Sequence, residues 1–390
     1  MRIERKLKMG MVGGGPGAFI GDVHRKAALM NGKIDLVAGA FSRDPEKSKP
    51  MARELFLEGG RAYGNYIEMI EKESRLPEGI RIDFVSIVTP NNLHFPVARD
   101  FLKKGFHVVC DKPMTVSVQE AKELRGIVEE SLRLFAVTHN YTGYPMVKLA
   151  RDLIRRREIG KIRKAVVTYP QGWLSTPLEQ TGNKQAAWRT DPEQSGPSGC
   201  MGDIGTHAGN LTEYVTGLKI THVCADLTTF VEDRRLDDDG NCLLRFDSGA
   251  KGVLHTSQIS VGEENDLAIR VYGEKKSVEW HQEHPDHLKV KELDGPAQTW
   301  SRGNEYVHRI SPGAARATRL PSGHPEGYIE AFANIYRNFA ETLLAQLEGV
   351  EPDELALDFP SVEDGVRSIQ FIEAVLASSK SEKKWTAVEK

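Results

Sequence analysis

The residues of this chain whose types and spacing fit proton transfer lie in two places. One is Asp111-Lys112-Pro113, and the other is the pair Asp203 and His207, four residues apart. If residues 204–215 are helical, that spacing places the pair on one helical face, where an Asp can fix the tautomer of a His that accepts a proton. A lysine can stabilise negative charge on the same substrate oxygen. Neither place is decisive alone, because a lysine before a helix is usually a solvated charge and an Asp before a helix is usually a cap.

A glycine-rich turn near the amino terminus has the G-x-G-x-x-A spacing of a dinucleotide site. It runs Gly13-Gly14-Gly15-Pro16-Gly17-Ala18, between an apolar run and a helical pattern. Bare backbone there admits a pyrophosphate, and free N–H groups at the start of the helix bind it. A structural turn is the plain alternative, but the strand before and the helix after favour dinucleotide binding. The cofactor residues expected here are Gly13, Gly15, Pro16, Gly17, Ala18 and Phe19.

The segment after the second expected strand bears on the choice between NAD and NADP. Asp44 precedes Pro45, so it is better explained as a helix N-cap than as a ribose ligand. Ser42 and Arg43 then occupy the discriminating position, where a hydroxyl and a guanidinium suit a 2'-phosphate. NADP is slightly favoured, although an Arg also lies flat against the adenine of NAD in some enzymes, and a solvated surface Arg is a third alternative.

Further cofactor contacts are expected where later strands of this region end, because ligands of doubly wound folds bind at that edge. The segment 89–94 could equally be a turn that begins a helix. Asn140 and Tyr141 fall where substrate hydroxyls could be met. The cofactor residues expected at this edge are Thr89, Pro90, Asn91, His94, Asp111, Lys112 and Asn140.

Residues 1–140 alternate short apolar runs with segments of helical period, which predicts a parallel sheet covered on both faces. The expected strands are Met9 to Val12, Ile34 to Ala40, Phe84 to Thr89, His107 to Cys110 and Leu134 to Thr138. The expected helices are Phe19 to Met30, Pro45 to Leu57, Phe95 to Lys104 and Val118 to Leu132.

Residues 141–390 change to a helix followed by strand-like runs with turn signals, which predicts antiparallel hairpins in a second domain. The expected strands are Ile162 to Tyr169, His222 to Phe230, Cys242 to Phe246, Gly252 to Ser260 and Leu267 to Tyr272. The expected helices are Tyr144 to Arg157, Glu326 to Leu347 and Val362 to Ser378, before a short terminal strand.

A long irregular stretch between strands, Gln171 to Gly202, is expected to contact substrate. Trp173, Trp188 and Arg189 lie in it among amides and cations. Indole rings stack on the C–H faces of a polyol, whose hydroxyls need fixed polar partners. The alternative is a surface flap whose tryptophans pack into the core. The expected substrate residues are Lys112, Asn140, Tyr141, Trp173, Trp188, Arg189, Asp203 and His207.

The chain resembles the Gfo/Idh/MocA oxidoreductases, named after glucose-fructose oxidoreductase and inositol dehydrogenase. The glycine turn, Thr89-Pro90 with His94, Asp111-Lys112-Pro113 and the run from Trp188-Arg189 through Ser195-Gly196 to Gly202-Asp203-Ile204-Gly205-Thr206-His207 carry the resemblance along essentially the whole chain. It implies an N-terminal Rossmann domain and a C-terminal α/β domain with a large open, mostly antiparallel sheet that commonly packs against another subunit, as in a homodimer or homotetramer. It also implies that Lys112, Asp203 and His207 match the catalytic residues. Asp111, where the family usually has Glu, and Cys200-Met201 depart from the pattern.

Composition narrows the class of partner and location. The 390 residues carry 52 Lys and Arg against 55 Asp and Glu, so the net charge of -3 predicts neither nucleic-acid nor acidic-membrane binding. No segment approaches the roughly 20 apolar residues of a membrane span. The four cysteines are scattered, and no signal peptide is recognised, which favours the cytoplasm.

No metal is expected. An expected hairpin loop carries His281, His284 and His287, which lack the spacing of common metal sites.

Three functions remain open at this level. The leading hypothesis is an NAD(P)-dependent dehydrogenase that oxidises a secondary hydroxyl of a sugar, sugar derivative or cyclitol. His207 then takes the hydroxyl proton with Asp203 orienting it, and Lys112 bonds the same oxygen, although the residues leave open which of Lys112 and His207 is the base. The second is a glycoside hydrolase that oxidises its sugar transiently. The third is a non-catalytic dinucleotide sensor, which retention of all three residues disfavours.

Overall fold

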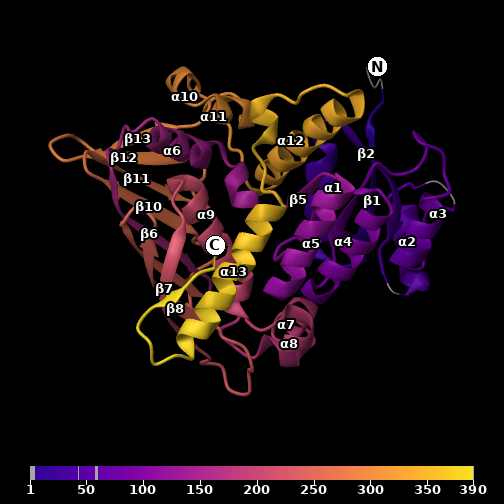
Figure 1. Cartoon of the computed structure of the whole chain (residues 1–390), viewed down its shortest axis with the longest axis horizontal. Coiled ribbons are helices and arrows are strands. Elements are labelled where there is room, and N and C mark those ends of the chain that lie inside the picture. The colour runs from indigo at the N-terminus through magenta and orange to yellow at the C-terminus, as the bar shows by residue number, and fades with distance from the viewer. Residues whose placement is uncertain (1–4, 43, 58–59, 390) are drawn as a thin grey trace. The chain divides into compact units, whose positions relative to one another are not determined.

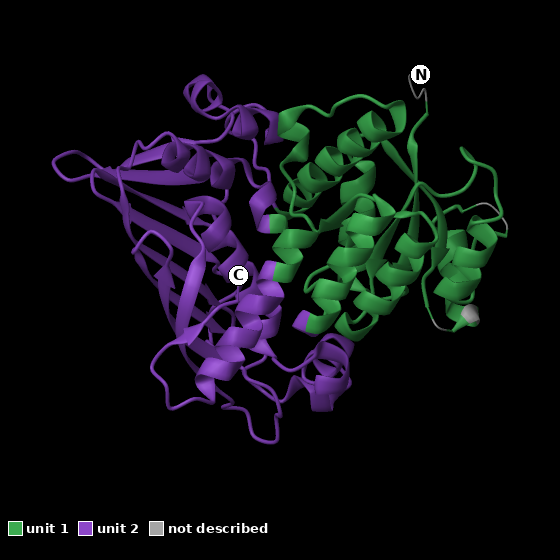
Figure 2. Ribbon diagram, viewed as in Figure 1, with its two compact units in different colours: residues 1–115, 119–140, 328–366 green, residues 116–118, 141–327, 367–390 purple. Residues whose placement is uncertain are grey.

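The computed structural model describes residues 5–42, 44–57 and 60–389 (Figure 1). They form two compact units, coloured separately in Figure 2. Unit 1 comprises residues 1–115, 119–140 and 328–366, and unit 2 comprises 116–118, 141–327 and 367–390. The expected boundary after residue 140 coincides with a boundary between the units. The expectation that 141–390 is one uninterrupted domain is wrong for 328–366, which belongs to unit 1.

Unit 1 is built on a five-stranded sheet in the order β2-β1-β3-β4-β5, in which each pairing is parallel. Its strands are β1 (Leu7–Gly13), β2 (Ile34–Ala40), β3 (Phe84–Val88), β4 (His107–Cys110) and β5 (Phe135–Val137). Its helices are α1 (Phe19–Leu29), α2 (Pro45–Glu54), α3 (Tyr66–Glu73), α4 (His94–Lys103), α5 (Val118–Ser131) and α12 (Tyr328–Glu348). The helix α13 (Val362–Ser379) begins in unit 1 and continues in unit 2. The predicted Rossmann arrangement is confirmed.

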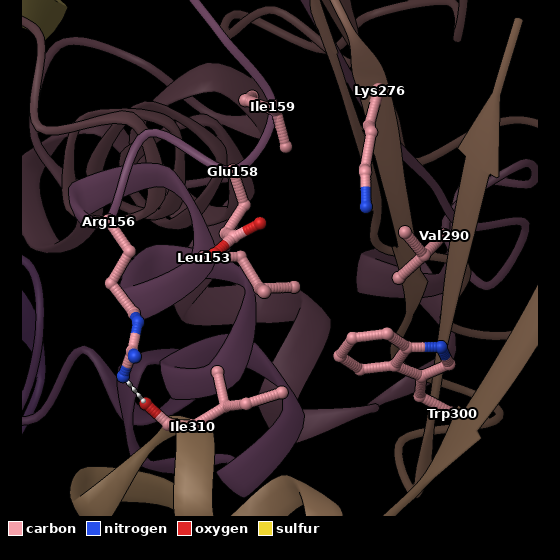
Figure 3. Close-up of a pocket in the computed structure, with 8 residues that line it drawn as sticks. All are labelled: Leu153, Arg156, Glu158, Ile159, Lys276, Val290, Trp300 and Ile310. Carbon is pink, nitrogen blue, oxygen red and sulfur yellow. Dashed lines mark hydrogen bonds between the residues drawn. The ribbon is translucent and has the colours of Figure 1, made fainter.

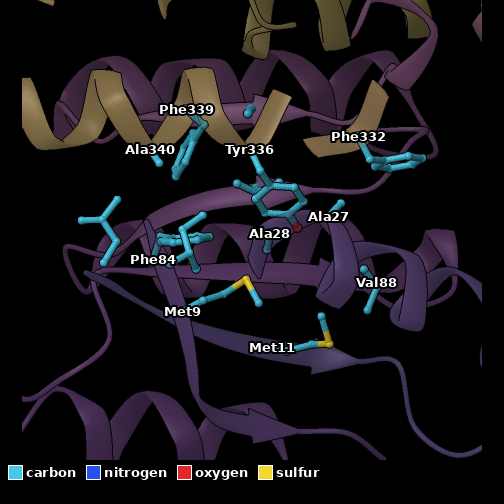
Figure 4. Packing of buried hydrophobic residues seen from close by; sticks show 14 of the residues in the cluster. Met9, Met11, Ala27, Ala28, Phe84, Val88, Phe332, Tyr336, Phe339 and Ala340 are labelled. Atoms are coloured by element: carbon cyan, nitrogen blue, oxygen red, sulfur yellow. The ribbon is translucent and has the colours of Figure 1, made fainter. Parts of the chain in front are cut away.

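The core of unit 1 explains why α12 returns to it. Phe332, Tyr336 and Phe339 of α12 are buried in the same cluster as Met9 and Phe84 of the sheet (Figure 4). The ring centroids of Phe84 and Phe339 lie 5.1 Å apart. An amphipathic helix forms most stably where its apolar stripe is buried, and the face of this helix is completed by a sheet more than 200 residues earlier in the chain.

Unit 2 is built on a nine-stranded sheet in the order β13-β12-β11-β10-β6-β9-β8-β7-β14. Among the described strands of this sheet, only β6 and β9 pair in parallel, so the predicted open, mostly antiparallel sheet is confirmed. Its strands are β6 (Ile162–Pro170), β7 (Ile220–Thr228), β8 (Asp239–Phe246), β9 (Lys251–Ser257), β10 (Ala268–Gly273), β11 (Lys276–His281), β12 (His287–Glu292), β13 (Gln298–Ser301) and β14 (Thr386–Ala387). Its helices are α6 (Pro145–Arg155), α7 (Lys184–Arg189), α8 (Pro192–Ser195), α9 (Thr206–Thr216), α10 (Glu305–Ile310) and α11 (Pro312–Ala317).

The sequence missed several elements of both units. The helix α3 and the strands β11, β12 and β13 were not expected, because short alternating runs rich in charge resemble loops. The stretch expected to be irregular holds the short helices α7 and α8. The dipeptide Asp239-Gly240, a common turn signal in sequences, forms the first two residues of β8. Among the described residues, no helix has the length and apolarity required to cross a membrane.

Candidate active site

Two positions of the glycine turn in unit 1 have no room for a side chain. Gly13 has a φ of +89°, and a Cβ there would lie 2.6 Å from the carbonyl oxygen of Val88. A Cβ on Gly15 would lie 2.6 Å from the carbonyl oxygen of Phe41. Pro16, Gly17 and Phe19 are exposed, and α1 starts at this turn without a side-chain cap at Ala18. The turn therefore leaves helix N–H groups available to a phosphate, which fits a dinucleotide.

Two residues of α1 that the sequence analysis missed hold this turn in place. Arg25 is 7 % exposed, and its Nη1 donates a 2.8 Å hydrogen bond to the carbonyl oxygen of Gly14. Gly21 lies so close to Gly14 that a Cβ on Gly21 would be 2.3 Å from the Cα of Gly14. Their spacing from the turn, within the first two turns of one helix, was the available signal.

The end of β2 bears on the adenosine site. The Oδ1 of Asp44 accepts a 3.0 Å hydrogen bond from the amide of Glu46, so the prediction that Asp44 caps α2 is confirmed. The Oγ of Ser42 accepts a 3.1 Å hydrogen bond from the amide of Asp44. Arg43, the other expected discriminating residue, lies outside the described residues.

The ring nitrogens of His94 face two backbone carbonyl oxygens, and the expected contact of this residue with the cofactor stays a prediction. Its Nδ1 lies 2.6 Å from the carbonyl oxygen of Pro113, and its Nε2 lies 2.9 Å from that of Thr89. Burial lowers the pKa of His94, against the opposing charge of Asp111. A neutral ring donates from only one nitrogen, so His94 hydrogen-bonds one of these two carbonyl oxygens, and its ring lies between the segments that carry them.

Two other expected cofactor residues have polar atoms that fit a ligand. The Oγ1 of Thr89 and both amide atoms of Asn140 are buried and have no hydrogen-bond partner within the described chain. Buried polar atoms are normally hydrogen-bonded, so a buried amide left open on both sides indicates a partner that binds from outside the chain. Asn91 is also buried, whereas Pro90 is only half-buried.

Asp111 and Lys112 follow β4, and the Lys112-Pro113 peptide is cis. The Oδ1 of Asp111 accepts a 2.7 Å hydrogen bond from Thr138 and lies 3.6 Å from the Nε2 of His24. Burial alone would raise the pKa of Asp111, but His24, followed by Lys112 and His94, lowers it. Oδ1 of Asp111 is thus used within unit 1, and the contact of Asp111 with the cofactor stays a prediction.

His139, which the sequence analysis missed, lies close enough to feel the charge of Lys112. Burial, followed by that charge, lowers the pKa of His139 to about 3. Its imidazole is therefore neutral at physiological pH.

In unit 2, Asp203 lies in a π-helical turn, Met201–Gly205, that leads directly into α9. The expectation that Asp203 also caps α9 is wrong, because Gly205 is the N-cap. Asp237, unforeseen from the sequence, accepts hydrogen bonds from Ser198 Oγ and from the amides of Gly199 and Met201 at 2.7–2.9 Å. It thereby anchors the segment that carries Asp203.

The side chains of Arg189 and Gln258 hold the carboxylate of Asp203. Its Oδ2 accepts a 3.2 Å hydrogen bond from Arg189 Nε and a 3.0 Å hydrogen bond from Gln258 Nε2. The guanidinium of Arg189 lies 4.3 Å from the ring centroid of Trp188 and 5.8 Å from that of Trp173. Four of the expected substrate residues thus gather in unit 2, and Gln258 joins them without a signal in the sequence.

His207 lies in a set of aromatic rings in the same unit. Its ring centroid is 4.8 Å from that of Tyr141, nearly perpendicular to it. The hydroxyl groups of Tyr141 and Tyr169 are hydrogen-bonded, and Tyr169 donates a 2.9 Å hydrogen bond to Asn265. Burial raises the pKa of Tyr141 to about 12, although the hydrogen bonds to Tyr169 and Asn265 act to lower it, so its hydroxyl stays protonated.

A chain of amides connects this ring set with Trp173. The Nε2 of Gln171 donates a 2.6 Å hydrogen bond to Asn265 Oδ1, and the indole N–H of Trp173 donates a 3.0 Å hydrogen bond to Gln171 Oε1. Indole and amide groups with fixed donors and acceptors suit a ligand that is rich in hydroxyl groups.

A separate cavity of about 110 Å³ in unit 2 contains none of the expected site residues (Figure 3). Its lining is Leu153, Arg156, Glu158, Ile159, Lys276, Val290, Trp300 and Ile310.

Comparisons with known proteins identify the family. Residues 7–139 match the model of the oxidoreductase family with an NAD-binding Rossmann fold, and residues 147–279 match the GFO/IDH/MocA C-terminal domain. The chain is 32% identical to the uncharacterized oxidoreductase YfiI of Bacillus subtilis over 98% of this chain and 97% of YfiI. The chain belongs to the Gfo/Idh/MocA family of oxidoreductases.

Two other family members have described activities or ligands. An inositol dehydrogenase homolog from Azotobacter vinelandii, solved with NAD+, has a TM-score of 0.93 and 35% identity and covers 99% of this chain and 98% of its own. The same homolog has been solved with NADH and myo-inositol, with a TM-score of 0.91. Levoglucosan dehydrogenase of Pseudarthrobacter phenanthrenivorans is 27% identical over 73% of this chain and 76% of its own length. This Gfo/Idh/MocA protein therefore has an NAD-binding Rossmann fold and relatives that are sugar or cyclitol dehydrogenases.

Proposed function

We propose that this protein is an NAD(P)-dependent dehydrogenase that oxidises a secondary hydroxyl group of a sugar, sugar derivative or cyclitol. The observation that carries the proposal is the arrangement around Asp203, whose carboxylate is fixed by Arg189 and Gln258 beside two indole rings. The names of its relatives support the same substrate class, since they include an inositol dehydrogenase homolog and a levoglucosan dehydrogenase.

The residues of unit 1 fit a dinucleotide. The turn from Gly13 to Ala18 would hold the pyrophosphate, and Thr89 and Asn140 would offer their buried polar atoms. Bound NAD(P) supplies the hydride acceptor. Ser42 and Arg43 favour NADP slightly, whereas the complexes of the Azotobacter homolog favour NAD.

Proton transfer falls to three side chains of this protein. His207 takes the proton of the substrate hydroxyl, and Asp203 orients His207. Lys112 donates a hydrogen bond to the same oxygen as negative charge develops there. Tyr141, Trp173, Trp188 and Arg189 hold the ring of the substrate and its other hydroxyl groups. If Lys112 is instead the base, His207 takes the stabilising part.

Removal of the proton-transfer groups is the direct test. The purified protein is first titrated with NADH and NADPH by fluorescence, and myo-inositol, levoglucosan, hexoses and glycosides are then screened for production of reduced cofactor. On the best substrate, Lys112→Ala and His207→Ala should each lower kcat by about 100-fold or more. The matched controls Lys104→Ala and His284→Ala, at exposed positions, should leave kcat unchanged. Near-normal turnover of both site variants would overturn the assignment.

Accounting for the cofactor separates the two enzymatic hypotheses. A dehydrogenase accumulates one reduced cofactor for each product molecule. Cleavage of a glycoside without net reduction of the cofactor would instead support the redox-assisted hydrolase, and tight NADH binding without turnover of any compound would support a sensor.

We also propose that the protein forms a homodimer or homotetramer through the sheet of unit 2. Leu243 of β8 and Tyr272 of β10 are 47% and 41% exposed on this sheet. Exposed apolar side chains on a broad sheet favour an interface with a second copy. Sedimentation of the wild type and of a Leu243→Lys variant tests this arrangement, since a monomeric wild type would exclude it.

A further inference from the structure

Unit 1 contains a buried polar cluster that the proposed reaction does not use directly. It consists of His24 of α1, Ser86 of β3 and Tyr336 of α12, each 0 % exposed. The Nδ1 of His24 lies 2.7 Å from the hydroxyl oxygen of Tyr336 and 3.3 Å from Ser86 Oγ. Ser86 Oγ and the hydroxyl oxygen of Tyr336 are 2.8 Å apart. Three elements that are distant in sequence thus meet at one set of hydrogen bonds.

The cluster ends on the residue that precedes Lys112. The Nε2 of His24 lies 3.6 Å from Oδ1 of Asp111, and Thr138 donates to the same oxygen at 2.7 Å. Facing a carboxylate, Nε2 is the nitrogen that carries the proton in a neutral ring, which leaves Nδ1 to accept a hydrogen bond from Tyr336. Ser86 then donates to the oxygen of Tyr336. Ser86, Tyr336 and His24 thus have consistent roles as donor or acceptor. The ring of His24 reaches Asp111 through a 3.6 Å contact, which is longer than a hydrogen bond.

Such a cluster needs a reason, because three apolar side chains would fill the same space without the cost of burying polar groups. A hydrogen-bonded set of side chains fixes one geometry more strictly than apolar packing does. The geometry fixed here is that of Asp111, whose backbone amide is also held by Ile87 O at 2.9 Å. Lys112 follows directly, and His94 holds Pro113 on its other side.

We propose that His24 and Tyr336 are positioning residues that set the orientation of Asp111 and, through it, of the Lys112 amine. The proposal rests on the proposed function, in which Lys112 bonds the reacting oxygen. It gives the returning helix α12 a part in the reaction beyond the packing of the core, since α12 carries Tyr336.

Conservative variants separate positioning from general stability. Tyr336→Phe removes one hydroxyl, His24→Leu removes both ring nitrogens, and His24→Gln keeps an amide donor near the position of Nε2. The matched control is Tyr63→Phe, which also removes a buried hydroxyl, one that is hydrogen-bonded to Glu73 Oε1 at 2.6 Å in the same unit. Amide hydrogen exchange across residues 107–113, the affinity for NADH, and kcat and KM on the screened substrate are measured for all four.

Tyr336→Phe and His24→Leu should speed amide exchange in residues 107–113 by about 10-fold and lower kcat by about 10-fold, with NADH affinity and KM within about 2-fold. His24→Gln should recover most of kcat, and Tyr63→Phe should change neither measurement. Unchanged exchange and kcat in Tyr336→Phe and His24→Leu would overturn the proposal, as would an equal loss of kcat in the control.

The two proposals fail in distinguishable ways. If no polyol is turned over, or if Lys112→Ala and His207→Ala both remain active, the proposed function fails, while hydrogen exchange still decides whether the cluster fixes residues 107–113. If Lys112→Ala is inactive but Tyr336→Phe and His24→Leu behave as the wild type, only the positioning proposal fails.

Discussion

The two units build their parts of the site by different means. In unit 1 the cofactor turn depends on the absence of side chains, since a Cβ on Gly13 or on Gly15 would lie 2.6 Å from a carbonyl oxygen. In unit 2 the site around Asp203 depends on side chains. Arg189 of the short helix α7 and Gln258, the residue after β9, donate hydrogen bonds to its carboxylate. A backbone site tolerates almost no change at a few positions, whereas a side-chain site shares its function among several groups.

The largest expected effect is therefore at Gly15. Gly15→Ala places a methyl group against the carbonyl oxygen of Phe41 and should weaken NADH binding by about 100-fold, equivalent to roughly 3 kcal/mol. Gly126→Ala in α5 is the matched control, because a Cβ there meets nothing within 4 Å. It should leave NADH binding unchanged and stabilise the helix by up to about 1 kcal/mol. Fluorescence titration measures the NADH affinity of both variants. Tight binding by Gly15→Ala would show that the turn can shift to accommodate a methyl group.

The same difference explains what the sequence could predict. The glycine turn, the five strands of the first sheet and the Asp44 cap follow local rules of spacing, so they were expected correctly. Arg189 and Trp173 were expected near substrate as members of one segment. Gln258, which bonds the same carboxylate, lies 55 residues after Asp203, and no local pattern connects the two.

Buried contacts between residues that are distant in the sequence could not be predicted either. Tyr336 has the spacing of an ordinary core residue on α12, and only folding brings it to His24, 312 residues away. His94 was expected at the cofactor from its position in the sequence, which does not show that its ring nitrogens lie against the carbonyl oxygens of Pro113 and Thr89. Periodicity predicts which face of a helix is buried, and it does not predict which polar partner that face meets.

A change at Arg189 should have a smaller effect than one at Gly15, because Gln258 still holds Asp203. Arg189→Met should lower kcat/KM for the polyol by about 30-fold, roughly 2 kcal/mol, and leave the affinity for NADH unchanged. Arg235→Met is the control. This exposed arginine pairs with a different carboxylate, that of Asp191, at a distance of 3.2 Å. Initial rates with varied polyol decide the matter. A loss confined to NADH binding would mean that Arg189 serves the cofactor.

Acid should destabilise unit 1 through its buried histidines. Burial, ahead of the charge of Arg133, lowers the pKa of His107 to about 4, and its Nδ1 accepts a 2.8 Å hydrogen bond from the amide of Leu134. Below the unfolded pKa of about 6.5 the unfolded chain binds the proton that the folded chain refuses, so stability falls as pH drops and levels off near the folded pKa. This single group should cost roughly 2 kcal/mol between about pH 7 and about pH 5.

Urea unfolding across this pH range tests the assignment. His107→Asn, which does not titrate, should flatten the pH dependence, whereas His284→Asn in the exposed β11–β12 loop should leave it as in the wild type. Hydrogen exchange should show the loss in unit 1. An equal loss in unit 2 would place the acid sensitivity elsewhere.

The smallest expected effect separates two interpretations of Asp44. As the N-cap of α2, its side chain accepts from Glu46 N, so Asp44→Ala should lower stability by about 1 kcal/mol and leave the ratio of NADH to NADPH affinity unchanged. As a ribose ligand, its removal would instead weaken NADH binding selectively and shift the ratio toward NADPH. Asp191→Ala is the matched control, because Asp191 caps α8 in unit 2 in the same way, through Glu193 N at 3.1 Å. A shift of the affinity ratio in Asp44→Ala alone would return this carboxylate to the adenosine site, and the acidic ribose ligand would then have to coexist with Ser42 and Arg43.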